Sequence, residues 1–338
     1  MSRSASTKET STSVATAPGV PLRERLLALG GPTGSVSIAL IIVLLIGYAT
    51  AGERFFTSNN LANLSAFVAL PIIVGICASF TLLSGVVDLS IGSMVGVSAA
   101  VFGWFVYNDY SPWVAALLCL AMCAFFGAVN ATAVVLLGAD TLATTLGMLT
   151  LLAGLTRVVI GPSPSPAFIP GLNSFTTMRM GPVNLMFLLA VILAAFAAFL
   201  VARMRVGRHI RAAGGDEVGA KRAGIPVARI RFLAFVVSAL GAGVAGILFV
   251  GQLGAPTRTL GMGLEFQVYA ALLIGGYSIL RGGVGNPIGG LFGILVVASI
   301  TNIMTVQFIS LSFVNLTIGI LLILAVFLDR LRGGDAFE

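Results

Sequence analysis

Long apolar stretches alternate with short polar ones along the whole chain. Most of them approach the roughly 20 residues that a helix needs to cross a hydrocarbon core of about 30 Å; the eighth is shorter. The pattern predicts an all-α integral membrane protein with about ten transmembrane helices. The expected stretches are 35–51, 61–83, 89–107, 112–138, 141–160, 183–202, 232–253, 266–280, 286–306 and 308–328.

Composition excludes a soluble fold. Of 338 residues, 58% are hydrophobic and only 9% are charged, and the mean hydropathy is +1.06. Soluble domains carry about 25% charged residues. The 41 glycines suit close helix packing, because small residues let helix backbones approach each other within a membrane.

Basic residues mark one side of the membrane. With the N-terminus in the cytoplasm, fifteen of the 19 Lys and Arg residues fall inside, as the positive-inside rule requires. The net charge of +7 therefore indicates topology and not nucleic-acid binding. Both termini are predicted to be cytoplasmic. The inside set is Arg3, Lys8, Arg23, Arg25, Arg203, Arg205, Arg208, Arg211, Lys221, Arg222, Arg229, Arg231, Arg281, Arg330 and Arg332.

The polarity pattern divides the chain into three parts. Residues 1–34 are expected to form a disordered cytoplasmic tail, 35–330 a transmembrane domain, and 331–338 a second cytoplasmic tail. Within the domain, 203–231 is the longest cytoplasmic connection and 161–182 is a proline-rich outer loop. That loop is interpreted as a docking surface for a partner, or else as a re-entrant or capping segment.

The chain lacks the residues that several kinds of catalysis require. The only lysines, Lys8 and Lys221, are not followed by Ser or Thr, so the chain has no phosphate-binding P-loop. The single histidine, His209, lies in the basic cytoplasmic connection and cannot serve as a base at membrane depth. We therefore expect no enzymatic activity and no cofactor.

Metal and proton sites are also not expected. Cys77, Cys119 and Cys123 lie inside apolar stretches and lack further ligands for a metal. The ionisable residues nearest the membrane are interpreted as span-end residues, with no buried carboxylate to bind a proton; they are Asp88, Asp140 and Arg157. The energy for transport would then come from another subunit, although sodium bound by backbone carbonyls would escape this argument.

A glycine-rich cytoplasmic turn leads into the third stretch. Asp88 and Ser90 can cap the incoming helix, and Gly92 and Gly96 favour close helix crossing. A role for Asp88 in transmitting motion is the alternative. A second such turn, 281–293, matches the first at an offset of 197 residues, which suggests duplication. The matching positions in the first turn are Gly85, Val87, Ile91, Gly92 and Gly96.

A short helix is predicted within the basic connection. Asp216 can cap its start, Lys221 and Arg222 lie near its end, and Gly224 with Pro226 stops it. Attraction to lipid headgroups explains the arginines but not the helix.

Together these motifs resemble the permease subunits of bacterial ABC importers of the ribose, xylose and galactose type. The resemblance rests on the Asp-Leu-Ser-Ile-Gly turn at 88–92, the Gly-Gly-Asp-Glu segment at 214–217 with Gly224-Ile225, and the glycine-rich 282–293 stretch. It covers about residues 36–332. It implies a permease bundle like those of type II importers, in the bacterial inner membrane.

The resemblance also implies partners. These are a second permease copy, identical or paralogous, a cytoplasmic ATP-binding-cassette ATPase, and a periplasmic or lipid-anchored solute-binding protein. The 214–224 helix would couple to the ATPase through Gly214, Gly215, Asp216, Glu217, Ala220, Lys221, Arg222 and Gly224. The transported solute would be a monosaccharide or a similar small polar solute. An ion-coupled carrier and a passive channel are the alternative functions.

Polar residues within the apolar stretches are candidates for the solute path. A sugar needs hydrogen-bond partners, since each unpaired hydroxyl costs about 1–3 kcal/mol. The candidates are Asn130, Thr144, Thr145, Asn302 and Asn315; helix–helix hydrogen bonding is the alternative role for each. Trp104, Tyr107, Tyr110 and Trp113 are interpreted as an outer aromatic belt, with sugar stacking by Trp104 or Trp113 as the alternative.

Overall fold

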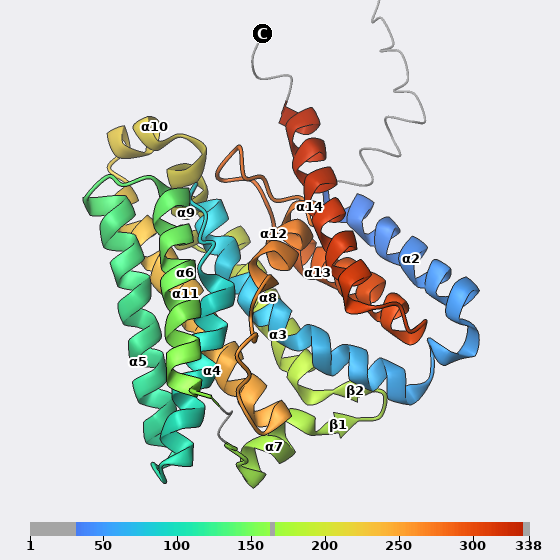
Figure 1. The fold of residues 1–338 in the computed structure, drawn as a ribbon. Coiled ribbons are helices and arrows are strands. Elements are labelled where there is room, and N and C mark those ends of the chain that lie inside the picture. The colour runs from blue at the N-terminus through green and yellow to red at the C-terminus, as the bar shows by residue number, and fades with distance from the viewer. Residues whose placement is uncertain (1–31, 163–165, 334–338) are drawn as a thin grey trace, which may run out of the picture.

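The computed structural model describes residues 32–162 and 166–333, which form a bundle of helices (Figure 1). The predicted tails lie outside these residues except at their inner ends. Residues 32–34 are the first residues of a helix, and 331–333 are the last residues of another. Prediction and structure therefore differ by a few residues at both ends of the domain.

Each of the ten predicted stretches contains a helix. Eight of these helices are long and apolar enough to cross a membrane, which confirms a predominantly helical membrane protein. The other two, α4 and α12, have 17 and 11 residues. The ten helices are α2 (Pro32–Ala51), α3 (Ser58–Leu83), α4 (Ile91–Tyr107), α5 (Pro112–Ala131), α6 (Thr141–Ile160), α8 (Leu185–Arg203), α11 (Val227–Leu253), α12 (Leu264–Ile274), α13 (Pro287–Val306) and α14 (Leu311–Gly333).

Short elements occupy the connections. The predicted outer loop contains a helix and the first strand of a two-stranded antiparallel sheet, in which Arg179 pairs with Asn184. The basic connection contains two helices, of which only the second was predicted. The short elements are η1 (Gly52–Arg54), η2 (Thr132–Leu136), α7 (Pro170–Thr177), β1 (Arg179–Met180), β2 (Val183–Asn184), α9 (Arg205–Gly215) and α10 (Glu217–Arg222).

The core is built around α3 and α11. Helix α11 packs against α3, α4 and α5, while α12 packs against α13 and α14. In the most apolar part of α3, 78% of the residues are buried, whereas the corresponding fraction is 11% in α2 and in α14. Figure 1 shows α2 and α14 on one flank of the bundle and α5 and α6 on the other. The outer helices present their apolar faces to lipid or to another subunit.

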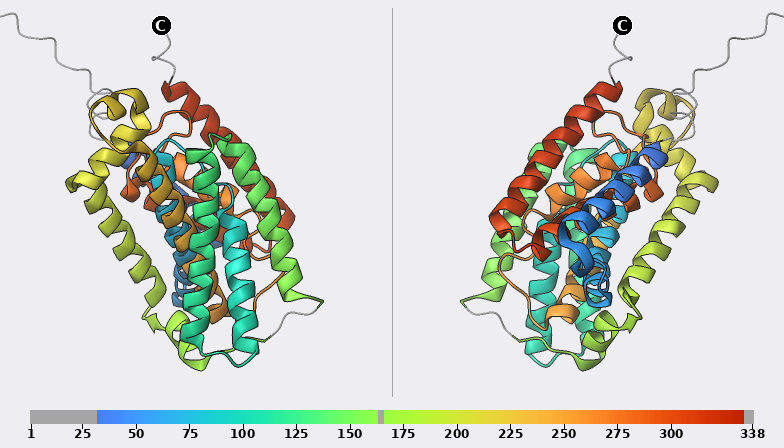
Figure 2. Two further views of the ribbon diagram at one scale, coloured as in Figure 1. Left: turned by 90° about the vertical axis from the view of Figure 1, so that its left-hand side faces the viewer. Right: turned by 90° about the vertical axis from the view of Figure 1, so that its right-hand side faces the viewer.

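The two ends of the bundle differ. Helices α9 and α10 lie at the end where α14 terminates, and α7 with the β1–β2 hairpin lies at the opposite end (Figures 1 and 2). The basic connection and the C-terminal end of α14 therefore share one side of the molecule. This arrangement agrees with the side that the basic residues predict for both.

Candidate functional site

The predicted coupling helix forms as α10. The Asp216 carboxylate accepts a hydrogen bond from the Gly219 amide at 2.9 Å, which confirms the predicted N-cap. Gly224 follows the helix with a φ of 76°, a left-handed conformation that ends it. Ala220 is buried, whereas Lys221 and Arg222 are exposed. The helix therefore rests on the bundle through Ala220 and turns its basic residues outward.

Two ion pairs involve α10, and one of them joins it to α11. Among the described residues, both salt bridges use Glu217: Lys221 Nζ lies 2.6 Å from one carboxylate oxygen, and Arg231 Nη1 lies 2.7 Å from the other. Hydrogen bonds from Lys221 and Arg231 lower the pKa of Glu217. The Glu217 carboxylate is thus held ionised between its own helix and α11.

Helix α9, which precedes α10, packs on the bundle. Its inward face is formed by Gly207, Ile210 and Ala213. The helix has eleven residues and ends in two glycines, Gly214 and Gly215. Each glycine in a helix costs about 1 kcal/mol relative to alanine. Packing against the bundle supplies what propensity lacks, which explains why the sequence alone did not predict this helix.

Three backbone segments meet where α9 ends. A Cβ built on Gly214 would lie 2.6 Å from the Gly283 amide nitrogen and 3.0 Å from that of Gly85. The Gly283 amide donates a hydrogen bond to the Leu83 carbonyl at 3.0 Å, and Arg211 donates to the Gly285 carbonyl at 2.9 Å. The end of α9 thus packs on both glycine-rich turns; we call this contact of Gly85, Gly214 and Gly282–Gly283 the glycine junction.

Asp88 lies at the centre of a buried network. Its Oδ1 accepts hydrogen bonds from the Ser90 amide at 3.1 Å and the Ser90 hydroxyl at 2.6 Å, and its Oδ2 accepts one from Ser238 at 3.0 Å. Asn130 donates to Ser90 at 3.0 Å, and the Asp88 amide donates to the Tyr269 hydroxyl at 2.9 Å. The turn before α4 is thereby tied to α5, α11 and α12.

One detail of the predicted turn is corrected and another is confirmed. Ser90 occupies the N-cap of α4 but makes no side-chain cap bond, because its hydroxyl instead donates to Asp88. Gly92 and Gly96 do allow close packing: a Cβ at Gly92 would collide with Glu265, and one at Gly96 with the Leu260 carbonyl.

The expectation that no carboxylate is buried is wrong. Asp88, Glu265 and Asp329 are 1%, 4% and 5% exposed, respectively. Asp329 Oδ2 accepts hydrogen bonds from the Ser278 hydroxyl and the Ile279 amide, both at 3.0 Å. Glu265 begins the short helix α12 and packs against Gly92 of α4. Its burial depends on this partner, which lies far away in the sequence.

The predicted path residues fall into two groups. Asn130 belongs to the Asp88 network, and Thr145 donates to the Thr141 carbonyl of its own helix at 2.9 Å. Thr144 is half-buried on α6. Asn302 and Asn315, in contrast, line a common cavity of about 490 Å³. The structure therefore brings together only two of the five candidates.

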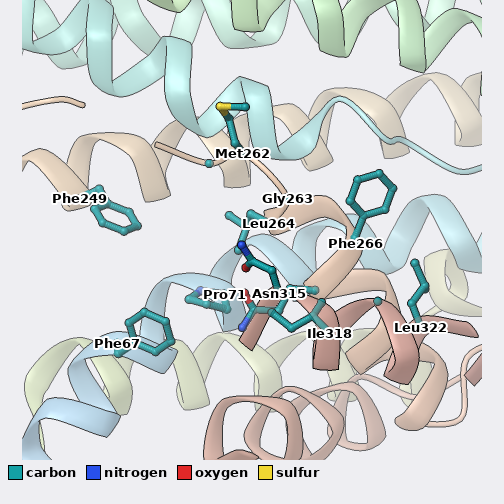
Figure 3. Close-up of a pocket in the computed structure, with 13 residues that line it drawn as sticks. Phe67, Pro71, Phe249, Met262, Gly263, Leu264, Phe266, Asn315, Ile318 and Leu322 are labelled. Carbon is teal, nitrogen blue, oxygen red and sulfur yellow. The ribbon is translucent and has the colours of Figure 1, made fainter. Parts of the chain in front are cut away.

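That cavity is part of a larger cleft. Three cavities share Phe67 as a lining residue, with volumes of about 370, 420 and 490 Å³; we call them together the Phe67 cleft. Figure 3 shows the first, in which the Asn315 amide lies among apolar side chains that include Phe67 and Leu264. The polar lining residues of the cleft include Asn63, Arg179, Gln252, Gln267, Thr301, Asn302, Thr305 and Asn315.

Several residues in or beside the cleft were not predicted from the sequence. Asn60 and Asn302 exchange side-chain hydrogen bonds at 3.0 and 3.1 Å between α3 and α13. Arg179 donates to Asn63 at 3.0 Å. The signal that could have found this set is the spacing of Asn60 and Asn63, which places two amides about one turn apart on α3.

Comparison with known proteins identifies the family. A family model described as the permease component of branched-chain amino acid transport systems matches residues 60–326. This range includes both glycine-rich turns, α9, α10 and the residues that line the Phe67 cleft. The chain belongs to this family. It is a permease subunit of an ATP-binding-cassette importer and a multi-pass protein of the inner membrane.

Relatives of this permease cover most of its length. The ribose import permease protein of Escherichia coli is 30% identical over 300 residues, 87% of this chain and 92% of the relative. The D-allose transport system permease protein of Escherichia coli is 31% identical over 301 residues, 88% and 91% of the two chains. The autoinducer 2 import system permease protein of Enterobacter is 30% identical over 302 residues, 88% and 87%. No solved structure matches the chain significantly.

Proposed function

We propose that this permease moves a monosaccharide or a similar small neutral polar solute into the cytoplasm by alternating access. The Phe67 cleft supports the solute class. Its lining combines amides and hydroxyls, which pair with sugar hydroxyls, with the aromatic rings of Phe67, Phe249 and Phe266. The names of the ribose and allose relatives point in the same direction.

The solute path in this proposal runs through the cleft. The cavity that contains Asn63, Thr176 and Arg179 adjoins the β1–β2 hairpin, at the end opposite α10. Asn302 and Asn315 line the next cavity, and Gln267 lines that one and the cavity of Figure 3. Phe67 lines all three cavities, so in this proposal the solute moves past this side chain from one set of amides to the next.

ATP is hydrolysed by a separate subunit in this proposal. The observation that carries it is the placement of α10: a short capped helix with outward Val218, Lys221 and Arg222 lies directly beside the glycine junction. A helix docked in an ATPase groove at this place can pass motion to both glycine-rich turns.

The assembly and topology follow from the same proposal. Ten helices cross the membrane with both ends in the cytoplasm, and α4 and α12 are counted among them although they are short. The outer loop 161–182, which contains α7 and β1, docks a solute-binding protein. A second permease copy completes the path. A cytoplasm-specific reporter fused after Arg332 should be active, whereas an active periplasm-specific reporter there would contradict this topology.

The decisive experiment is uptake by the assembled importer. The permease, its ATPase and its binding protein would be reconstituted in vesicles and supplied with radiolabelled ribose, allose, xylose or galactose. We expect accumulation of at least one sugar that needs ATP and resists a protonophore. Accumulation abolished by the protonophore would indicate an ion-coupled carrier, and equilibration without ATP would indicate a channel. No movement of any of the four sugars would contradict the solute class.

A further inference from the structure

One side chain joins the coupling helix to the transmembrane turn beneath it. The Arg231 guanidinium donates through Nη1 to Glu217 of α10 at 2.7 Å and through Nε to the Ser84 carbonyl at 3.0 Å. Its side chain is only 19% exposed. The two bonds use different edges of one rigid planar group. A movement of Glu217 therefore displaces the guanidinium and, with it, the hydrogen bond to the Ser84 carbonyl.

Arg231 is not needed to stabilise either α10 or α11. It is the fifth residue of α11 (Val227–Leu253), far from the C-terminal turn where the helix dipole favours a positive charge. Glu217 already has a partner in Lys221, four residues along the same helix. The α10 helix therefore keeps its own ion pair and its Asp216 cap without Arg231.

The turn that Arg231 holds leads into the bundle. Ser84 precedes Gly85 of the glycine junction, and four residues later Asp88 binds Ser90 and Ser238. Through Ser90, Asn130 of α5 is included. A displacement of Ser84 that is carried along the backbone to Asp88 thus reaches three helices through buried hydrogen bonds: α5, α11 and, through Tyr269, α12, which carries the cleft residue Gln267.

The glycine junction alone cannot carry motion in both directions. The contact of Gly214 with Gly85 is a packing contact, which resists compression but breaks when the two segments separate. A charge-assisted hydrogen bond also resists separation. The other hydrogen bonds beside the junction do not involve α10: the Gly283 amide donates to the Leu83 carbonyl at the end of α3, and Arg211 of α9 donates to the Gly285 carbonyl.

We propose that Arg231 is the positioning residue that transmits movement of α10 to the Ser84–Ser90 turn and so to the Phe67 cleft. This inference rests on the proposed docking of α10 on an ATPase. Arg231 touches neither solute nor nucleotide in this role. It converts a change at the docked helix into a change of the turn before α4.

The test uses a reporter in the cleft of the full permease–ATPase complex. Asn315→Cys places a thiol in two of the cleft cavities, and its reaction rate with a membrane-impermeant maleimide is measured without nucleotide and with ATP plus vanadate. Labelling of the parent chain, which keeps its native cysteines, is subtracted. No transported solute is needed for this measurement.

Four chains are compared: the reporter alone and the reporter with Arg231→Met, Arg231→Lys or Arg229→Met. Arg229 is exposed and lies two residues earlier, so it controls for the loss of one basic residue in the same turn. We expect ATP to change the labelling rate in the reporter chain and in Arg229→Met. In Arg231→Met that change should be lost while the ATPase still co-purifies and hydrolyses ATP. Arg231→Lys should restore part of this change, because its single ammonium group replaces a guanidinium that donates to two acceptors.

The outcomes separate the inference from the function beneath it. An unchanged ATP response in Arg231→Met would overturn the role of Arg231 and leave docking intact. Loss of the ATPase from that complex would show that Arg231 supports the docking surface itself, which also overturns it. Loss of the ATP-dependent change in labelling in Arg229→Met as well would show that the loss of one basic residue, and not the contacts of Arg231, causes the effect. No ATP response in the reporter chain with its ATPase bound would contradict the proposed function.

Discussion

Gly282 packs directly against Gly85: a Cβ built on Gly282 would lie 2.7 Å from the Cα of Gly85. These are corresponding positions of the two glycine-rich turns, 197 residues apart in the sequence. Gly214 of α9 fills the remaining side of the contact, close to the backbone of both turns. The internal match therefore marks two segments that meet at the end of α9, next to α10.

Gly214→Ala should disrupt this junction. The new methyl group would meet backbone atoms of Leu83 and Gly283, which cannot move as a flexible side chain can, and overpacking of this kind costs about 1–3 kcal/mol. We expect a lower thermal unfolding temperature in detergent and a loss of coupled transport.

Gly215→Ala is the matched control for that change. It lies in the same last turn of α9, and its nearest neighbour would be the Gly282 carbonyl oxygen at 3.8 Å. Its unfolding temperature should stay near that of the parent chain. Equal effects of the two substitutions would contradict the packing account.

Asp88→Asn should weaken the turn before α4. The carboxylate uses both oxygens as acceptors, from Ser90 and from Ser238. An amide offers one oxygen, so one buried hydroxyl loses its acceptor, at a cost of about 1–3 kcal/mol in the free energy of unfolding. Thermal unfolding measures this loss. Asp109→Asn is the control, because Asp109 is exposed and has a φ of 61°, a conformation that Asn tolerates. An Asp88→Asn protein that unfolds at the same temperature as the parent chain would show that these hydrogen bonds do not contribute to stability.

The long helices can be predicted from the sequence because each one is marked by a run of apolar residues that are neighbours in the chain. The Asp216 cap is equally local, since cap and capped amide lie three residues apart. Glu265 and Arg231 could not be placed in this way. Glu265 is buried by Gly92, and Arg231 meets a carbonyl 147 residues away. Which polar residues face a cleft also depends on how the helices are turned, so Asn130 and Asn315 look alike in the sequence.

Cysteines at Asn315 and at Asn130 should differ in accessibility. Asn315 is exposed and lines the Phe67 cleft, whereas Asn130 is fully buried in the Asp88 network. A membrane-impermeant maleimide should label Asn315→Cys in at least one transport state and leave Asn130→Cys unlabelled in all of them. The labelled fraction is read by a mass shift on a gel. Labelling of Asn130→Cys, or none of Asn315→Cys, would contradict the proposed path.

The last prediction tests α10 as the docking element without removing a charge. Ala220→Pro eliminates the amide that donates to the Asp216 carbonyl at 2.9 Å, and proline inside a helix costs about 3 kcal/mol. The arginines from Arg203 to Arg211 remain, so membrane insertion should be normal. We expect an inserted permease that no longer co-purifies with its ATPase and whose uptake falls to background. Ala228→Pro is the control, because residue 228 lies in the first turn of α11, where the missing amide is tolerated. Attraction of this segment to lipid headgroups predicts that both variants retain the ATPase, since neither loses a basic residue. Retention in Ala220→Pro would therefore remove α10 as the docking element and leave the two glycine-rich turns as the remaining candidates for that contact.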